Sequence, residues 1–488
     1  MVNKGWGINE HRHFIAHYEN VNTFLDPIYG YIAFTKHKEG EVSEEDIIDS
    51  AWVQRLRRIH QLQAAWWVFP SAEHSRFQHS IGVMHLAGEF AGHLYDFFID
   101  AVGGQRKNLP SISKFVETAR LAGLLHDIGH GPFGHFFDNS YLRPVWQTNH
   151  EVIGQKILLT ELKPFIEGIR RSPLTEFKPQ EQLHAEDIAY LIKRPEATDK
   201  STGPDWLLLL RGLFSGLYTA DSLDYVCRDA YMSGVCLDVV DIQRILYYSH
   251  VQKSATGEYL FTLHRNGASA LRRFLQTRFY MYDSIYNHRT VRAIEMEMEQ
   301  VFRETVDLFL SDNPLNRLEE YLNLDDWSLI SKACELANKD PGELGKHWQA
   351  IIIRNPTWQM VFETRVHREY TPDFLDLRNQ DDKEDKENKL AEAIVSEANK
   401  SARTITKGDI RVDIVSLDLR PERSLLQIYD PETKSLVSNP WGIVSAGVPA
   451  RSFIVRVYTN QAKYVGETTR AATAVIRGQE DKFIDTNI

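Results

Sequence analysis

Five side chains that could bind a metal or move a proton lie within residues 124–138, which read LLHDIGHGPFGHFFD. They are His126, Asp127, His130, His135 and Asp138. Neutral imidazoles combined with carboxylates suit a divalent metal. One histidine alone could instead stabilise a helix C-terminus, and one aspartate could cap a turn. So dense a group is better explained by a metal-dependent active site.

The residues before this stretch predict the element that positions it. Apolar residues recur near helical period from Phe115 to Leu125, which predicts a buried helix. Gly129, Gly131 and Pro132 then break that helix. The pattern predicts a helix that ends at His126-Asp127 and a loosened turn that brings further histidines to the same small space.

A metal site here needs ligands from other parts of the chain. His79 lies near the start of a helix predicted over 76–98, and Asp221 lies on one predicted over 207–225. A lone His or Asp on a helix is more often a core or capping residue, so spacing alone does not decide between the two readings.

Residues 268–309 contain neither Gly nor Pro and predict one long helix. Within it lies a stripe of residues spaced three or four apart, which would share one helix face: Arg278, Tyr282, Tyr286 and Arg289. Such a stripe can bind phosphates and a sugar. It can equally be a tyrosine-lined helix interface with arginines that extend to solvent.

The remaining pattern predicts a mostly α-helical fold with a smaller α+β C-terminal lobe. The predicted domains are a catalytic core over 1–378, a charged linker or exposed helix over 379–400, and the lobe over 401–488. Further helices are predicted over 44–62 and 150–162, a loop over 194–205, and strands over 31–34, around 258–264, and over 411–417, 425–429 and 453–458.

Composition restricts the class of protein. The chain has 488 residues, 43% of them hydrophobic and 25% charged, as in ordinary globular proteins. Its net charge of −11 disfavours binding to nucleic acid or to an anionic membrane. No apolar run approaches the roughly 18 residues that a membrane span needs. Cys227, Cys236 and Cys334 form no CxxC pair, so we expect a reducing, cytoplasmic location.

His79, the pair His126-Asp127 and the distant Asp221 resemble the H…HD…D signature of HD-domain metal-dependent phosphohydrolases. The chain is similar in particular to the deoxynucleoside triphosphate triphosphohydrolase branch, which includes the animal enzyme with a SAM and an HD domain and the bacterial dGTPase-like proteins. The resemblance covers nearly the whole chain, and we expect no SAM domain before it. It rests on residues 26–30, 54–62, 69–80, 124–138, 221–229 and 286–289, with weaker similarity at 411–417 and 456–458.

The resemblance implies a role for each matching residue. His79, His126, Asp127 and Asp221 would bind a divalent metal (Mn, Fe, Mg or Zn). His130, His135 and His150 would lie beside the phosphates, with His150 as proton donor to the leaving group and Asp138 orienting the His135 region. The phosphate-binding arginines would be Arg76 and Arg278, and the residues around the deoxyribose would be Gln61, Leu62, Tyr225, Asp229 and Tyr286, with Tyr282 on the same stripe.

Several positions depart from the family pattern. Ser222 stands where relatives carry a basic residue that touches phosphate, so one cationic contact is missing. Asp49, Gln54 and Arg57 match the guanine nucleotide activator site of the animal enzyme. However, Asn22 replaces a lysine of that site, and His250 and His264 replace arginines, which leaves nucleotide-activated tetramerisation open.

The resemblance implies hydrolysis of a deoxynucleoside triphosphate to deoxynucleoside and inorganic triphosphate by a homo-oligomer, a dimer or tetramer. Three alternatives remain: an HD phosphohydrolase acting on a monophosphate, guanosine polyphosphate or cyclic nucleotide; a nucleotide-binding regulatory protein; and, disfavoured by the negative charge, a nucleic-acid-binding protein.

Overall fold

The computed structural model describes residues 20–103, 109–193, 203–235, 240–254, 257–367, 380–400, 404–418, 426–445 and 451–484. These residues fall into two compact units. The first unit comprises residues up to 277 together with 306–329 and 421–444; the second comprises 278–305, 330–420 and 445–488. The boundaries predicted from the sequence at 378 and 400 stay a prediction.

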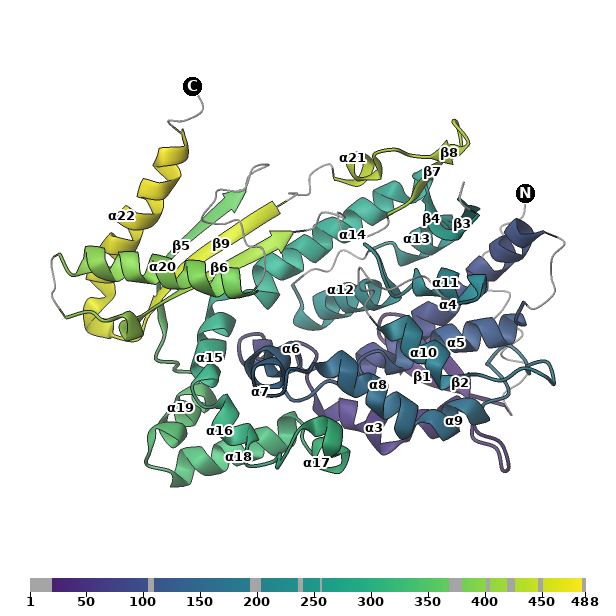
Figure 1. The fold of residues 1–488 in the computed structure, drawn as a ribbon, viewed down its shortest axis with the longest axis horizontal. Helices are drawn as coiled ribbons and strands as arrows, with labels where there is room; N and C mark the ends of the chain where they lie inside the picture. The colour runs from purple at the N-terminus through teal and green to yellow at the C-terminus, as the bar shows by residue number, and fades with distance from the viewer. Residues whose placement is uncertain are drawn as a thin grey trace. The chain divides into compact units, whose positions relative to one another are not determined.

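The first unit is mainly helical, and Figure 1 labels its elements. Its core is the long helix α4 (Arg76–Val102) packed along α5 (Ile112–Leu125), with α12 (Ala220–Ser233) against α4. The other helices are α2 (Glu44–Ile48), α3 (Ala51–Arg55), α6 (His135–Phe137), α7 (Arg143–Trp146), α8 (His150–Thr160), α9 (Lys163–Gly168), α10 (Ala185–Ile192), α11 (Asp205–Arg211), α13 (Ile242–Tyr248), α17 (Leu318–Leu322) and α21 (Pro440–Val444).

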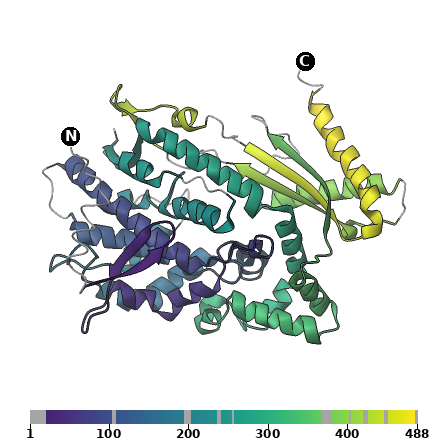
Figure 2. The same cartoon turned by 180° about the vertical axis from the view of Figure 1, so that it is seen from behind.

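Two small sheets complete the first unit. Strands β1 (Val21–Asp26) and β2 (Gly30–Thr35) form an antiparallel hairpin, drawn in purple in Figure 2. The second sheet has the order β3-β4-β7-β8, in which β4 and β7 are parallel. Its strands are β3 (Ser249–Lys253), β4 (Tyr259–His264), β7 (Ile428–Asp430) and β8 (Ser435–Leu436).

The second unit contains an antiparallel sheet of order β5-β9-β6, with bounds Gln359–His367, Arg451–Thr459 and Ile410–Asp418. Residues on β6 and β9 alternate between its two faces, as the two-residue period of a strand requires. One face packs on α20 (Gln380–Ala398) and α22 (Val465–Ile484) through one apolar cluster. The unit also holds α15 (Arg289–Glu299) and α19 (Glu343–Ile352).

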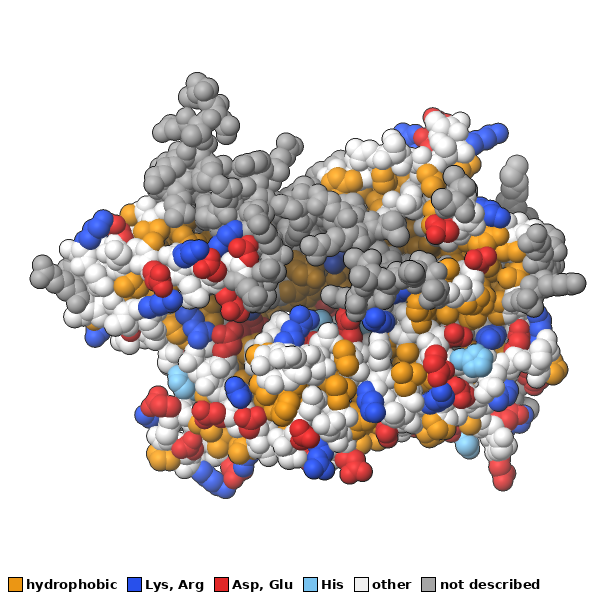
Figure 3. All heavy atoms as spheres, viewed as in Figure 1, with side chains coloured by type: hydrophobic (Ala, Val, Ile, Leu, Met, Phe, Trp, Pro, Cys, Tyr) orange, Lys and Arg blue, Asp and Glu red, His pale blue; other side chains and the backbone are white. Residues whose placement is uncertain are grey.

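Three helices continue from one unit into the other along the chain: α14 (Ala268–Met281), α16 (Phe302–Val306) and α18 (Asp326–Lys339). The predicted fold class, mostly α with a smaller α+β part, is confirmed. On the face seen in Figure 3, acidic and basic side chains are interspersed with hydrophobic ones. No helix in the described part of the chain is long and apolar enough to cross a membrane.

Three of the predicted long helices are wrong in extent. The helix predicted over 44–62 is two short helices and a 3-10 turn, and the one predicted over 207–225 is α11 and α12 with a turn between them. The helix predicted over 268–309 ends at Met281 and continues as a π-helical turn, Tyr282–Tyr286, before α15. The charged run after residue 380 begins α20, and the loop predicted over 194–205 lies mostly outside the described residues.

Candidate metal centre and active site

The predicted metal ligands lie at the ends of three helices: the start of α4, the end of α5 and the start of α12. A capping box between Ser75 and Gln78 starts α4 and puts His79 on its first turn. Helix α5 ends with His126 as its C-cap, so Asp127 lies in the following turn. A second capping box, between Thr219 and Ser222, starts α12 and puts Asp221 on its first turn.

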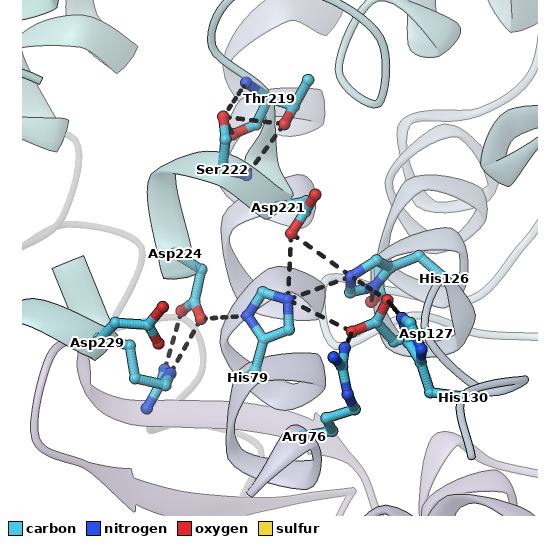
Figure 4. Close-up of polar contacts among 12 residues, drawn as sticks. Arg76, His79, His126, Asp127, His130, Thr219, Asp221, Ser222, Asp224 and Asp229 are labelled. Atoms are coloured by element: carbon cyan, nitrogen blue, oxygen red, sulfur yellow. Dashed lines mark hydrogen bonds and ion pairs between the residues drawn. The ribbon is translucent and has the colours of Figure 1, made fainter. Parts of the chain in front are cut away.

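The four side chains converge, as Figure 4 shows. The Nε2 atom of His79 lies 3.1 Å from Oδ1 of Asp221 and 3.2 Å from Nε2 of His126. The Nε2 atom of His126 lies 3.4 Å from Oδ1 of Asp127 and 3.6 Å from Oδ1 of Asp221. The structure thus brings together all four residues predicted as ligands.

Hydrogen bonds on the far side of each imidazole fix which nitrogen faces the centre. Nδ1 of His126 lies 2.8 Å from the carbonyl oxygen of Gly123, which can only accept, so this nitrogen carries the proton. Nδ1 of His79 lies 2.8 Å from Oδ2 of Asp224 and donates to it. Both Nε2 lone pairs are therefore directed at the centre, between two carboxylates, which is the donor set that a divalent metal requires.

The charges of this group favour a cation. Burial lowers the pKa of His79, but its hydrogen bonds to Asp221 and Asp224 outweigh burial and raise that pKa to about 10. Burial raises the pKa of Asp221, but hydrogen bonds from His126 and His79 outweigh it and lower the pKa. Without a metal, protons on the imidazoles balance the carboxylates; a divalent cation fits the same residues.

A buried ion network supports His79 from behind. Asp224 accepts two hydrogen bonds of 2.9 Å from Arg228, and Nη1 of Arg228 lies 2.7 Å from Asp26 at the end of β1. Burial raises the pKa of Asp224, but the charge of Arg228 and the bond to His79 lower it to about 2. Asp224 is therefore an ionised acceptor that orients His79.

A second group of titratable residues lies after the turn: His130, His135, Asp138 and His150, which together offer ligand-type atoms within 4.8 Å of one another. The rings of His130 and His150 stack at 3.7 Å, and Nδ1 of His150 makes a short hydrogen bond to Asp138. His150 starts α8, where Asn149 caps the helix.

Burial sets the charge state of this second group. It lowers the pKa of His130, and the charges of Arg76 and His150 lower it further. Burial also lowers the pKa of His135, despite its bond to Asp138. Burial raises the pKa of Asp138, but bonds from His135 and His150 outweigh it and lower the pKa. The group thus combines two neutral imidazoles with a carboxylate that holds His150.

Two glycines allow the close packing of this region. A Cβ on Gly129 would lie 2.0 Å from the carbonyl oxygen of His150, so only glycine lets the turn after Asp127 approach α8. Gly134 has a φ of +53°, and a Cβ there would lie 2.3 Å from the guanidinium of Arg76. Arg76 passes through that space to pair with Asp127.

Ser222, the departure from the family pattern, has a role in the fold. Its hydroxyl accepts from the Thr219 backbone N–H at 2.9 Å, while its own N–H donates to the Thr219 hydroxyl at 3.0 Å. It is buried. The Ser222 side chain is therefore engaged in starting α12, the helix that carries Asp221.

The predicted sugar-binding residues are split between the two units. Gln61 and Leu62 follow η1 (Leu56–Arg58), and Leu62 is buried. The Tyr225 ring lies 6.5 Å from the His79 ring, and Asp229 accepts from His74 at 2.7 Å. These four lie in the first unit with the metal ligands.

Arg278, Tyr282 and Tyr286 lie in the second unit. Arg278 lies over the Tyr282 ring at 5.8 Å, and the Tyr282 and Tyr286 rings meet edge to face at 4.9 Å. The prediction that they share one α-helix face with Arg289 is wrong, because α14 ends at Met281. Their role in binding stays a prediction.

The predicted activator residues lie close together in the first unit. Gln54 accepts from Arg57 at 2.8 Å and donates to the Ile48 carbonyl oxygen at 2.8 Å. The Arg57 guanidinium lies 3.6 Å from the centre of the Phe77 ring. Burial lowers the pKa of Arg57, and the charge of Asp49 opposes this.

Three further residues were expected to differ from the activator site of the animal enzyme. Asn22 donates to Glu45 at 2.8 Å, and the His250 and His264 rings lie 6.3 Å apart.

Comparison with known proteins places this geometry in a family. The HD domain description matches residues 76–194, which include His79, His126 and Asp127. The chain contains an HD domain. Asp221 lies beyond the matched part of the HD domain and joins the other three predicted ligands from α12.

The relatives of this HD protein include deoxynucleotide hydrolases. The chain is 28% identical over 316 residues to the "Deoxynucleoside triphosphate triphosphohydrolase SAMHD1 homolog" of Dictyostelium discoideum, across 64% of this chain and 55% of that protein. It is 29% identical over 298 residues to an uncharacterised protein of Methanocaldococcus jannaschii, across 60% and 53%. The chain thus spans about half the length of these relatives. The predicted resemblance to the HD-domain dNTP triphosphohydrolase family is confirmed.

A solved structure shares the fold of this HD protein. It is a hypothetical protein from Aquifex aeolicus, with a TM-score of 0.66 and 21% identity, and the match covers 92% of this chain and 99% of that one. This match extends the fold similarity over both units.

Sequence reasoning missed the residues that support the site rather than form it. Asp224 and Arg228 lie within the quoted segment 221–229, and their spacing of four on one helix was the available signal for an ion pair. Arg55 donates to the His130 carbonyl oxygen at 2.6 Å from a position 75 residues away, for which the sequence holds no signal.

Proposed function

We propose that the protein is a metal-dependent phosphohydrolase that cleaves deoxynucleoside triphosphates to deoxynucleoside and inorganic triphosphate. The observation that carries the proposal is the juxtaposition of two groups joined by one short turn. His79, His126, Asp127 and Asp221 offer metal ligands, and His130, His135, Asp138 and His150 offer proton carriers beside them. The similarity to dNTP triphosphohydrolases supports the choice of substrate.

The first group would hold the metal, and the second would act on the leaving group. A divalent cation bound by these ligands supplies Lewis acidity and a water of lowered pKa. Water adds to the α-phosphorus and loses a proton to solvent, while the bond between phosphorus and the 5′ oxygen breaks. Nδ1 of His150 donates to Asp138, and the carboxylate stabilises the imidazolium form of the ring. In that form Nε2 also carries a proton, which would pass to the departing 5′ oxygen and leave a neutral imidazole.

Buried cations and neutral donors can stabilise the charged phosphates. Arg76 is buried beside Asp127 and provides a fixed positive charge next to the ligand group. His130 lies 3.3 Å from Asp127 and connects the two groups. His135 is half exposed and can approach a substrate from solvent. Such preorganised groups stabilise charge that develops in the transition state.

A second candidate is hydrolysis of a less charged nucleotide by the same site. Ser222 favours it. The resemblance implies a basic residue that touches phosphate at this position, whereas the Ser222 hydroxyl is bonded to Thr219 and carries no charge. The substrate then would be a monophosphate or a cyclic nucleotide, and the identity of the phosphate product separates the two candidates.

The test is anion-exchange analysis of products from each of the four deoxynucleoside triphosphates, with Mn²⁺ or Mg²⁺ and with or without GTP. We expect deoxynucleoside and intact triphosphate in equal amounts. The double variant His126→Ala with Asp127→Ala is expected to lose metal content and turnover together; turnover by a metal-free double variant would refute the assignment of the centre. Product formation from monophosphates alone would favour the second candidate.

A further inference from the structure

The turn between His130 and His135 places one residue, Phe133, in a backbone conformation that it does not favour. Phe133 has a φ of +58° and is followed by Gly134 at +53°. A phenylalanine in the left-handed region carries a steric penalty, and such residues persist only where the surroundings fix them. Phe133 is also fully buried, so the contacts that fix it can be identified.

Asp326, which lies 193 residues further along the chain, binds this turn directly. Its Oδ1 atom accepts the backbone N–H of Phe133 at 2.8 Å. Its Oδ2 atom accepts the backbone N–H of His60 at 2.8 Å and lies 2.7 Å from Nδ1 of the same residue. Asp326 is fully buried at the start of α18, so one carboxylate holds two distant segments.

A stack of four aromatic rings also joins the His60 segment to the turn that contains Phe133. His60 stacks on Trp66 at 5.1 Å, Trp66 on Trp67 at 4.2 Å, and Trp67 on Phe133 at 5.6 Å, all within 26° of parallel. The residues at the two ends of this stack are the two that Asp326 binds. The carboxylate therefore closes a ring of contacts around residues 60–67.

Neighbouring contacts hold the adjacent backbone from the same side. The Tyr321 hydroxyl donates to the Gly129 carbonyl oxygen at 2.7 Å. Arg55 donates to the carbonyl oxygens of His130 and Leu324, each at 2.6 Å. Residues 321–326 thus support the turn through Tyr321, Leu324 and Asp326.

We propose that Asp326 is a positioning residue that fixes the His130–His135 turn relative to the Gln61–Leu62 stretch. Phe133 is three residues from His130 and two from His135, and His60 precedes Gln61. A displacement at Asp326 therefore moves the proton-transfer histidines and the predicted sugar-binding residues together. We call the contacts of Asp326 with His60 and Phe133 the Asp326 clamp. The roles assigned to the histidines and the sugar-binding residues rest on the proposed function, whereas the clamp itself does not.

Two variants separate the two halves of the clamp. Asp326→Ala removes both acceptor oxygens and with them all three contacts. Asp326→Asn keeps one acceptor oxygen, and its amide nitrogen can donate to Nδ1 of His60 but cannot accept the His60 backbone N–H. The matched control is Asp325→Asn, because Asp325 is a neighbouring buried carboxylate whose hydrogen bonds go to Arg58 and to the Ser328 N–H.

Hydrogen exchange measured by mass spectrometry tests the clamp without any substrate. In Asp326→Ala we expect at least tenfold faster exchange in peptides covering 57–63 and 128–136. In Asp326→Asn we expect that acceleration in one of the two peptides. In Asp325→Asn, whose partner Arg58 lies in the first peptide, we expect no acceleration in the peptide covering 128–136. If Asp326→Ala does not fold, the Asn variant decides; unchanged exchange in both peptides of a folded Asn variant overturns the proposal.

Kinetics then test the positioning of the site. With a deoxynucleoside triphosphate as substrate, Asp326→Asn is expected to raise KM at least fivefold while Mn²⁺ affinity stays within threefold of wild type. A merely structural role would lower the active fraction, and so kcat, with KM unchanged; that result overturns the positioning role. Absence of turnover in the wild type would count against the proposed function, while the exchange result would still judge the clamp.

Discussion

Replacing Asp224 by Asn should weaken metal binding without touching any ligand. The Asp224 carboxylate accepts three hydrogen bonds, one from His79 and two from Arg228. An asparagine offers a single oxygen, and its amide nitrogen, if turned towards His79, forces the proton onto Nε2 of that ring. The nitrogen that faces the metal centre would then have no lone pair to donate.

General values for such contacts give the size of this effect. A buried hydrogen bond to a charged acceptor contributes about 1.5–3 kcal/mol. Loss of an outer partner of a metal-bound histidine typically weakens metal affinity by about 10- to 100-fold, or about 1.4–2.8 kcal/mol. The two ranges agree, so we expect the dissociation constant for Mn²⁺ to rise between tenfold and a hundredfold in Asp224→Asn.

Isothermal titration of the metal-free protein with Mn²⁺ measures this directly, and circular dichroism establishes that the variant is folded. Asp26→Asn is the matched control, because Asp26 pairs with the same Arg228 at 2.7 Å, while His79 is bound by Asp224. We expect its affinity to stay within threefold of wild type. A folded Asp224→Asn protein with wild-type affinity would refute the role of the carboxylate in orienting His79.

Three further outcomes are expected. Gly129→Ala should lower the melting temperature and abolish turnover, because the new Cβ would lie 2.0 Å from the His150 carbonyl oxygen; a calorimetric scan showing wild-type stability would contradict this. His150→Ala should lower kcat by about 100-fold or more with Mn²⁺ binding retained, as single-turnover kinetics would show; a kcat near wild type would exclude it as proton donor. In the second unit, burial raises the pKa of Glu387 to about 7, so its ionisation destabilises the fold as pH rises from about 4.5 to 7. Glu387→Gln should therefore be more stable than wild type at pH 8, by up to about 3 kcal/mol, but not at pH 4.5; chemical denaturation at both pH values measures this, and equal differences at the two would contradict it.

The convergence of the four predicted ligands could be anticipated from the sequence, because these residues belong to short motifs with local structure. His126 and Asp127 follow a helix whose apolar period is plain, and His79 and Asp221 each follow a capping residue at a helix start. A motif of this kind fixes both the residue and the end of the element that carries it.

Helix boundaries were less predictable, because side chains decided them. The break after Met281 occurs in a stretch without glycine or proline. There the Asn287 side chain donates to the Tyr282 carbonyl oxygen at 2.8 Å, and His288 caps α15. These bonds compete with helical ones, and periodicity alone does not reveal which prevails.

The supporting residues could not be predicted, because their contacts depend on the tertiary fold. Asp326 reaches Phe133 across 193 residues, and Arg55 reaches Leu324 across 269. Nothing in the residues around Asp326 distinguishes it from an ordinary acidic residue at a helix start. Only the packing of the first unit shows that it is buried and holds two segments.

The central proposal is tested most directly by hydrolysis of dGTP and the other three deoxynucleoside triphosphates in ¹⁸O-labelled water, with mass spectrometry of both products. We expect the label in intact inorganic triphosphate and an unlabelled deoxynucleoside, because water adds to the α-phosphorus and the 5′ oxygen leaves. Label in orthophosphate or pyrophosphate, or in the 5′ hydroxyl of the deoxynucleoside, would contradict the proposed reaction.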